Sequence, residues 1–193
     1  MSILSGVFKR KSLPSEPSTK NILSVAVAEK HLQARLGMRP TGKAGICFRT
    51  AESSAFSNLE KEIQVYLTLG EKNSGTRYAV KSDSYGSRWI ILADDQFDDL
   101  VTETYMVIQA FSEHGFERCL LAAIFPFRRE DQTVHWIYTC KRGTFYPFAP
   151  LSETRQRDNS LELTLSALIG QQLPVEQELA NWYPLWDVPF DII

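Results

Sequence analysis

Segments with the pattern of β-strands come in adjacent pairs in this chain, and each pair is followed by a segment with the pattern of a helix. Residues 76–80 and 88–93 form one pair, and residues 119–127 and 133–141 form the other. Strands that follow one another directly are joined by tight turns and lie antiparallel, whereas parallel strands need a long crossover. The pattern therefore predicts an α+β fold, in which helices pack mainly on one face of an antiparallel or mixed sheet.

Four segments combine the apolar spacing of helices with helix start and stop signals. Their expected ranges are 21–36, 54–69, 94–114 and 158–169. A single strand is expected at 41–50, so the predicted order of elements is α-β-α-ββ-α-ββ-α. Residues 1–20 are expected to be a flexible, basic segment and linker, and residues 21–193 a single domain.

Two helices have candidate N-terminal caps. Ser57 and Glu60 have the spacing of a capping box for the second helix. Asp94 or Asp95 is expected to cap the third, where the acidic run at 94–99 suits the positive end of the helix dipole. Capping explains these carboxylates without a metal ion, because their spacing is not that of a calcium loop.

The stretch from His135 to Pro150 is expected to be a buried strand, a turn at Gly143, and an aromatic, proline-containing ribbon. The segment 182–186, Trp-Tyr-Pro-Leu-Trp, is too apolar for a free tail and is expected to pack back on the domain. Basic residues and one tyrosine around the ribbon form a candidate partner-binding site for an acidic peptide, a phosphate or a lipid head group. These residues are Lys141, Arg142, Tyr146, Arg155 and Arg157. The alternative is a solvated turn that leads into the next helix.

A second candidate site lies near the N-terminus. Ile3, Leu4, Val7 and Phe8 would share one side of a short helix, and three basic residues follow at once. An apolar face beside a basic cluster can bind an anionic membrane surface. The candidate membrane-surface residues are Phe8, Lys9, Arg10 and Lys11. The alternative is a frayed terminus whose apolar residues contact the core.

The loop from Gly37 to Ala44 nearly matches the phosphate-binding pattern G-x-x-x-x-G-K-[ST] and supplies an alternative function, nucleotide binding. Ala44 stands where the hydroxyl that binds magnesium is required, and Pro40 lacks an amide donor. A helix precedes the loop and a strand follows it, which is the reverse of the order that the motif needs.

Composition and spacing exclude several other classes of function. The net charge of −2 gives no general attraction to nucleic acid. The three cysteines are widely spaced, so neither a zinc site nor a disulfide framework is expected, and no cofactor is predicted. His31, His114 and His135 lack metal-ligand spacing, and no Gly-x-Ser-x-Gly elbow is present, so the chain is predicted not to be an enzyme. With no apolar run of about 20 residues and no secretory signal, we expect a cytoplasmic protein.

Several stretches together resemble one family, PspAB, the proteins associated with the phage-shock protein PspA. The stretches are 36–42 (LGMRPTG), 83–89 (DSYGSRW), 99–102 (DLVT), 141–150 (KRGTFYPFAP), 157–163 (RDNSLEL), 173–176 (LPVE) and 182–186 (WYPLW). They span nearly the whole chain after the linker.

The resemblance implies a role in the response to envelope stress, in which PspA-type coiled-coil proteins bind stressed membranes. It implies no catalytic residues. The expected function is therefore a non-enzymatic adaptor or regulator that binds a PspA-like coiled-coil protein. The order of elements also resembles the small α+β fold of YbjN-like proteins and type III secretion chaperones, which is a likeness of fold alone.

Overall fold

The computed structural model describes residues 19–83, 86–151 and 155–193. The candidate membrane-surface residues Phe8, Lys9, Arg10 and Lys11 lie outside the described residues.

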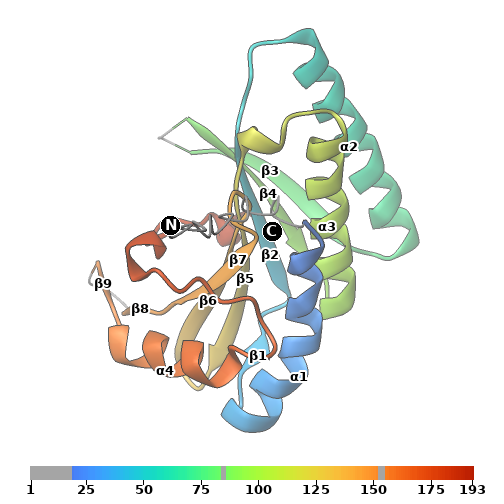
Figure 1. The fold of residues 1–193 in the computed structure, drawn as a ribbon. Coiled ribbons are helices and arrows are strands. Elements are labelled where there is room, and N and C mark those ends of the chain that lie inside the picture. Colours follow the sequence, from blue (N-terminus) through green and yellow to red (C-terminus); the bar gives the residue numbers. More distant parts are fainter. Residues whose placement is uncertain (1–18, 84–85, 152–154) are drawn as a thin grey trace, which may run out of the picture.

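Within the described residues, a seven-stranded antiparallel sheet forms the centre of the fold (Figure 1). Its strand order is β3-β4-β2-β5-β6-β7, and the short strand β1 pairs with β5. The strands are β1 (Arg39–Pro40), β2 (Lys43–Arg49), β3 (Arg77–Ser82), β4 (Ser87–Ala93), β5 (Leu120–Arg129), β6 (Gln132–Thr139) and β7 (Thr144–Phe148). A separate two-stranded ribbon joins β8 (Pro150–Leu151) to β9 (Gln156–Arg157).

Three of the four described α-helices cover one face of this sheet (Figure 1). The helices are α1 (Ser24–Leu36), α2 (Ser54–Asn73), α3 (Phe97–Glu113) and α4 (Asn159–Ile169). The short 3₁₀ turns are η1 (Thr19–Leu23), η2 (Glu117–Cys119), η3 (Leu179–Asn181) and η4 (Phe190–Ile192). Phenylalanine rings join the helices to the sheet: Phe48 of β2 lies 5.1 Å from Phe111 of α3, centroid to centroid. Helix α4 lies beside β7 and also contacts α1.

The predicted α+β class with an antiparallel sheet is confirmed, and the observed order adds strands that the pattern did not predict. The aromatic ribbon after Gly143 is strand β7, which pairs with β6 in register from Thr144 to Phe148. Its alternating side chains are buried on both faces, so it reads as a continuous apolar run and not as the alternating pattern of a half-exposed strand.

Two of the predicted caps are wrong. Ser53, not Ser57, caps α2, because its Oγ accepts a hydrogen bond from the backbone N–H of Phe56. Helix α3 begins at Phe97 without a side-chain cap, and Asp94 instead accepts hydrogen bonds from Thr76 Oγ1 and from the N–H of Gln96. Asp94 thus joins β3 to the start of α3. In α4, by contrast, Asp158 caps the N-terminus, because its Oδ1 accepts a hydrogen bond from the backbone N–H of Leu161.

The other face of the sheet carries a row of small and branched apolar residues. Directly paired residues of neighbouring strands point to the same face, and one such row runs Ala79, Ile91, Gly45, Ile124, Ile137 and Tyr146. Residues 175–193, hereafter the C-terminal segment, cover this face. The segment starts at the free edge of β7, where Val175 pairs with Phe145, and Phe190 later lies over Gly45.

Candidate partner-binding surface

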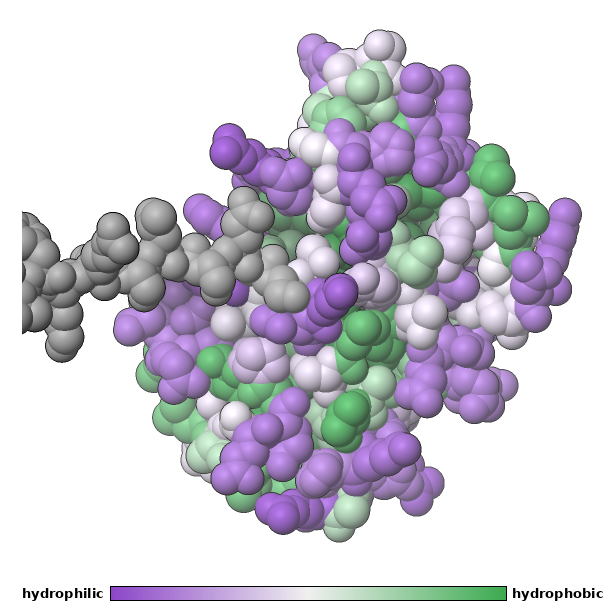
Figure 2. Space-filling view, turned by 45° about the vertical axis from the view of Figure 1, so that its right-hand side comes forward, coloured by the Kyte–Doolittle hydropathy of each residue, from purple (hydrophilic) through white to green (hydrophobic). Residues whose placement is uncertain are grey.

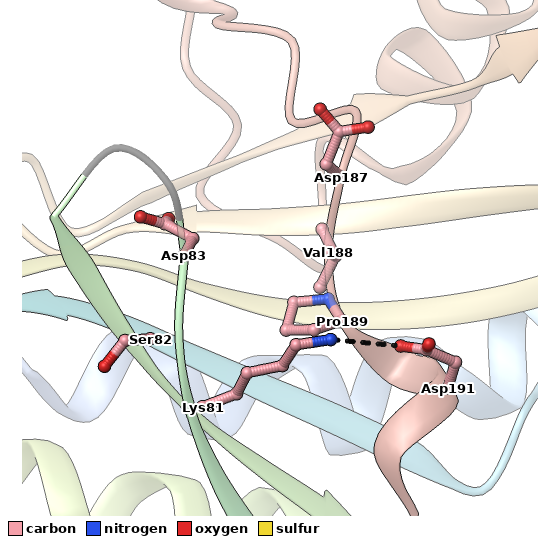
Figure 3. A pocket seen from close by; sticks show the side chains of 7 residues that line it. All are labelled: Lys81, Ser82, Asp83, Asp187, Val188, Pro189 and Asp191. Atoms are coloured by element: carbon pink, nitrogen blue, oxygen red, sulfur yellow. Dashed lines mark ion pairs between the residues drawn. The ribbon is translucent and has the colours of Figure 1, made fainter.

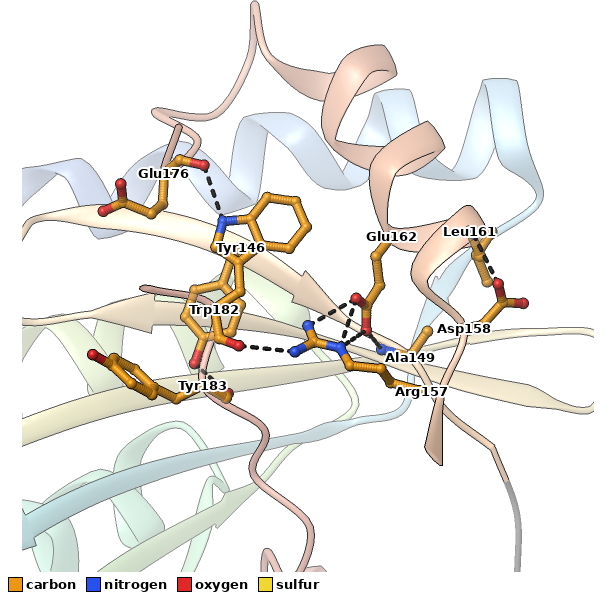
Figure 4. A network of polar contacts seen from close by, with 9 residues as sticks. All are labelled: Tyr146, Ala149, Arg157, Asp158, Leu161, Glu162, Glu176, Trp182 and Tyr183. Carbon is orange, nitrogen blue, oxygen red and sulfur yellow. Dashed lines mark hydrogen bonds and ion pairs between the residues drawn. The ribbon is translucent and has the colours of Figure 1, made fainter. Parts of the chain in front are cut away.

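Tyr146, one of the candidate binding residues, lies beneath the C-terminal segment. Its ring stacks on the indole of Trp182, with centroids 6.1 Å apart and planes at 18°. Its hydroxyl donates a hydrogen bond of 2.8 Å to the backbone carbonyl of Tyr183 (Figure 4). Burial raises the pKa of the phenol, so it remains a hydrogen-bond donor at neutral pH. Tyr146 therefore holds the segment in place and is not part of the open surface.

Arg157 of β9 lies at the centre of a polar network that joins α4, the end of β7 and the C-terminal segment (Figure 4). Its guanidinium forms an ion pair with Glu162, with N–O distances of 2.7 to 3.0 Å, and donates to the carbonyl of Trp182 at 2.8 Å. The same group lies over the ring of Phe148, 5.3 Å from its centroid. Glu162 is only 1% exposed and also accepts a hydrogen bond from the backbone N–H of Ala149. A buried carboxylate needs such partners, so Arg157 serves the interior of the fold.

Arg142 and Glu176 form a second link to the C-terminal segment. The Nε of Arg142 lies 3.5 Å from Glu176 Oε2, and its Nη2 donates to Asn181 Oδ1 at 2.8 Å. Burial alone would raise the pKa of Glu176. Hydrogen bonds from Glu178, Asn181 and Thr144, together with the Arg142 charge, outweigh burial and lower the pKa. Glu176 therefore stays ionised and keeps Arg142 attached.

The two remaining candidates are on the surface. Lys141 is exposed in the turn between β6 and β7. Arg155 pairs with Asp187 of the C-terminal segment at 3.0 Å, and both side chains are mostly exposed. Along with the half-exposed Arg142, they place positive charge at the margin of the C-terminal segment.

A shallow hollow of about 270 Å³ separates the β3–β4 hairpin from the C-terminal segment (Figure 3). Lys81 of β3 crosses it to Asp191 at 3.9 Å, and Asp187, Val188 and Pro189 form the far wall. The Lys81–Asp191 pair is exposed, so it contributes little to stability. Among the residues that the structure describes, no group of three or more His, Cys, Asp or Glu side chains could hold a metal ion.

The loop from Gly37 to Ala44 is occupied by contacts within the chain. The Nζ of Lys43 donates to the carbonyl oxygens of Phe190, at 2.5 Å, and Ile193, at 2.8 Å. Gly37 ends α1 in the left-handed conformation and Lys43 begins β2, so a helix precedes the motif and a strand starts at its lysine. In a phosphate-binding loop the order is reversed and the lysine is directed at phosphate. Lys43 here attaches the end of the C-terminal segment to the sheet.

The pKa values of three side chains of the sheet region, His135, Cys47 and Cys140, are shifted so that their neutral forms are favoured. Burial lowers the pKa of His135 to about 4, and its ring packs edge-on against Phe148 and Phe190. Burial is also the largest cause that raises the pKa of Cys47 and of Cys140 to about 12. A thiol that stays protonated is a weak nucleophile, and an imidazole with so low a pKa is a weak base.

Sequence reasoning identified the cationic and aromatic side of this interface but missed its acidic partners. Glu162 is one turn into α4 and Glu176 lies two residues after Pro174, so both read as ordinary surface residues. The available signal was the spacing of Arg157 and Glu162, which become neighbours once Asp158 caps the helix. The expectation that residues 182–186 pack back on the domain agrees with the contacts of Trp182 and Trp186.

The fold and this surface define a class of protein: an α+β domain whose antiparallel sheet has helices on one face and the chain's own C-terminal segment on the other. Among the described residues, no helix is long and apolar enough to cross a membrane. A family model, PspAB (PspA associated protein B), matches residues 1–190, and the chain belongs to that family. Comparisons with curated proteins and with solved structures gave no match.

Proposed function

We propose that the chain is a non-enzymatic adaptor that binds a PspA-like coiled-coil protein in the response to envelope stress. The observation that carries the proposal is the match of residues 1–190 to a family named for its association with PspA. An adaptor of this kind acts in the cytoplasm, at the inner face of the membrane.

The binding surface we propose is the margin of the C-terminal segment, around Lys141, Arg142 and Arg155. These cationic groups are exposed or half-exposed, whereas Tyr146 and Arg157 are engaged below them. Exposed Arg and Lys side chains on a rigid frame suit an acidic stretch of a partner helix, because they can pair with its carboxylates. Tyr146 and Arg157 then have an indirect role, since they hold the C-terminal segment, which carries Asp187, in place beside this surface.

Affinity capture with the full chain as bait, from cells under envelope stress, tests the proposal. We expect the bait to retain a PspA-like protein, and the double variant Lys141→Glu, Arg155→Glu to retain much less. The matched control is Lys30→Glu, Arg35→Glu, which reverses two exposed charges on α1 and changes the net charge equally.

Recovery of no PspA-like protein with the unmodified bait would overturn the adaptor function itself. Equal losses in both double variants would leave the partner in place but remove the proposed surface, because a general charge effect would then explain the result. Circular dichroism of each variant checks that the fold is intact.

A further inference from the structure

A groove between α2 and α3 lies on the outer side of the helix layer, away from the C-terminal segment. It is lined on α2 by Glu62, Ile63 and Tyr66 and on α3 by Met106, Ala110 and Glu113, and it holds about 130 Å³. Apolar side chains in and beside it remain open to solvent: Val65 is 61% exposed, Leu69 51% and Met106 39%. Figure 2 brings this side of the molecule forward, and hydrophobic patches lie there between hydrophilic side chains.

The charge around the α2–α3 groove has one dominant sign. The charged side chains that line the groove are those of Glu62 and Glu113, and none of its lining residues is a lysine or an arginine. On the α2 side, Glu62 lies at the groove and is 3.2 Å from His114. An apolar floor with an acidic rim suits a segment that is apolar on one side and basic on the other, and repels an anionic surface.

An unsatisfied polar group lies at the same helix contact. Glu103 of α3 is 8% exposed, packs against Gly70, and leaves its Oε2 without a hydrogen-bond partner. Burial is the main cause that raises its pKa. The hydrogen bond with Tyr66 opposes that rise, and the nearby Asp99 and Asp94 add to it. A buried acid beside two further carboxylates is stabilised by a cation placed over it.

The chain itself contains a segment of that chemistry. Ile3, Leu4, Val7 and Phe8 precede Lys9, Arg10 and Lys11, and the described part of the chain starts at Thr19, in η1, which packs against α3. The seven residues from 12 to 18 can span about 23 Å. Because η1 packs against α3, this length of chain starts at one of the two helices that form the groove.

We propose that residues 3–11 of this chain dock in the α2–α3 groove, with their apolar side chains on its floor and their basic side chains against its acidic rim. The docking is intramolecular, so a contact that is weak for a free peptide benefits from a high effective concentration. The inference does not rest on the PspA partner, because it concerns a different surface and the chain alone.

Methionine methyl groups report on this docking. The chain has three methionines: Met1, two residues before the segment, Met38 at 0% exposure in the core, and Met106 at the groove. In carbon-13 methyl spectra, deletion of residues 2–12 is expected to shift the Met106 resonance and leave Met38 in place. Reversal of all three basic residues (Lys9→Glu, Arg10→Glu, Lys11→Glu) is expected to move Met106 toward its position in the truncated chain. The control Lys30→Glu, Arg35→Glu is expected to leave it unmoved.

A Met106 resonance that is identical in the full and truncated chains would overturn the proposal. If co-sedimentation with anionic vesicles is also lost on truncation, the ligand of residues 3–11 is the membrane surface. A Met106 shift that grows with protein concentration would equally contradict docking within one chain, because it would indicate a second copy.

Discussion

Replacement of Arg157 by alanine tests whether its ion pair with Glu162 holds the β8–β9 ribbon, α4 and the C-terminal segment together. The variant removes the Nε–H that donates to both carboxylate oxygens of Glu162, the Nη2 that forms the ion pair, the donor to the Trp182 carbonyl, and the cation over Phe148. Glu162 then still accepts a hydrogen bond from the Ala149 N–H, and it lies in the first turn of α4. A carboxylate that is 1% exposed is thereby left without its counter-ion.

Breaking a buried ion pair by removal of one partner costs about 3–5 kcal/mol. For a domain of this size, each kcal/mol lowers Tm by roughly 2–4 °C, so we expect Tm to fall by roughly 6–20 °C. The matched control is Arg155→Ala, since Arg155 also pairs with an aspartate of the C-terminal segment, but on the surface. An exposed pair contributes at most about 1 kcal/mol.

Urea unfolding followed by far-ultraviolet circular dichroism and by tryptophan fluorescence measures both variants. The fluorescence reports on Trp89 and Trp136 in the sheet and on Trp182 and Trp186 in the C-terminal segment. In Arg157→Ala, part of its change is therefore expected at lower urea than the change in circular dichroism. If Arg157→Ala destabilises the protein no more than Arg155→Ala does, the network is not a buried determinant of stability and the reasoning fails. The double variant Arg157→Met, Glu162→Leu should recover part of the loss, because it removes the uncompensated charge.

Three further perturbations address the faces of the sheet and the helix layer. A Cβ at Gly45 would lie 3.4 Å from the Phe190 ring, so Gly45→Val is expected to displace Phe190. Amide hydrogen exchange should then increase in residues 188–193 while the sheet stays protected. Unchanged exchange in residues 188–193 would contradict the packing of Phe190 on Gly45. Burial lowers the pKa of His135 to about 4, below its usual value of about 6.5. The contribution of the neutral ring is therefore full above pH ~6.5 and is lost as pH falls to about 4; His135→Leu should flatten the decline of unfolding free energy over that range, and an identical pH profile would refute the assignment. The raised pKa of Glu103 means that its ionised form is the unfavourable one, so Glu103→Gln should stabilise the protein at pH 7 and progressively less as pH falls; a destabilisation that is independent of pH would show that the carboxylate is favourable where it lies.

Local signals in the sequence determined the elements and the class of fold. Paired strand patterns, the Asp158 cap and the left-handed Gly37 after α1 all act within a few residues, so they can be read without the rest of the chain. Apolar spacing also identified the inner faces of α2 and α3, because helix periodicity is a property of the segment itself. The same local reading indicated that the segment at 182–186 would pack on the domain.

Only the tertiary structure decided what the polar residues do. Arg142, Tyr146 and Arg157 look like a binding site in sequence, yet their partners Asn181, Tyr183 and Trp182 become neighbours through long-range packing. Lys43 likewise resembles a phosphate ligand until the chain end, 150 residues away, supplies its acceptors.

The physical reason is that a hydrogen bond or ion pair depends on distance and burial, and neither is encoded at one position. The acidic groove follows the same rule. Glu62 and Glu113 are far apart in the sequence, and only the packing of α3 against α2 places them at one groove with partly exposed Met106.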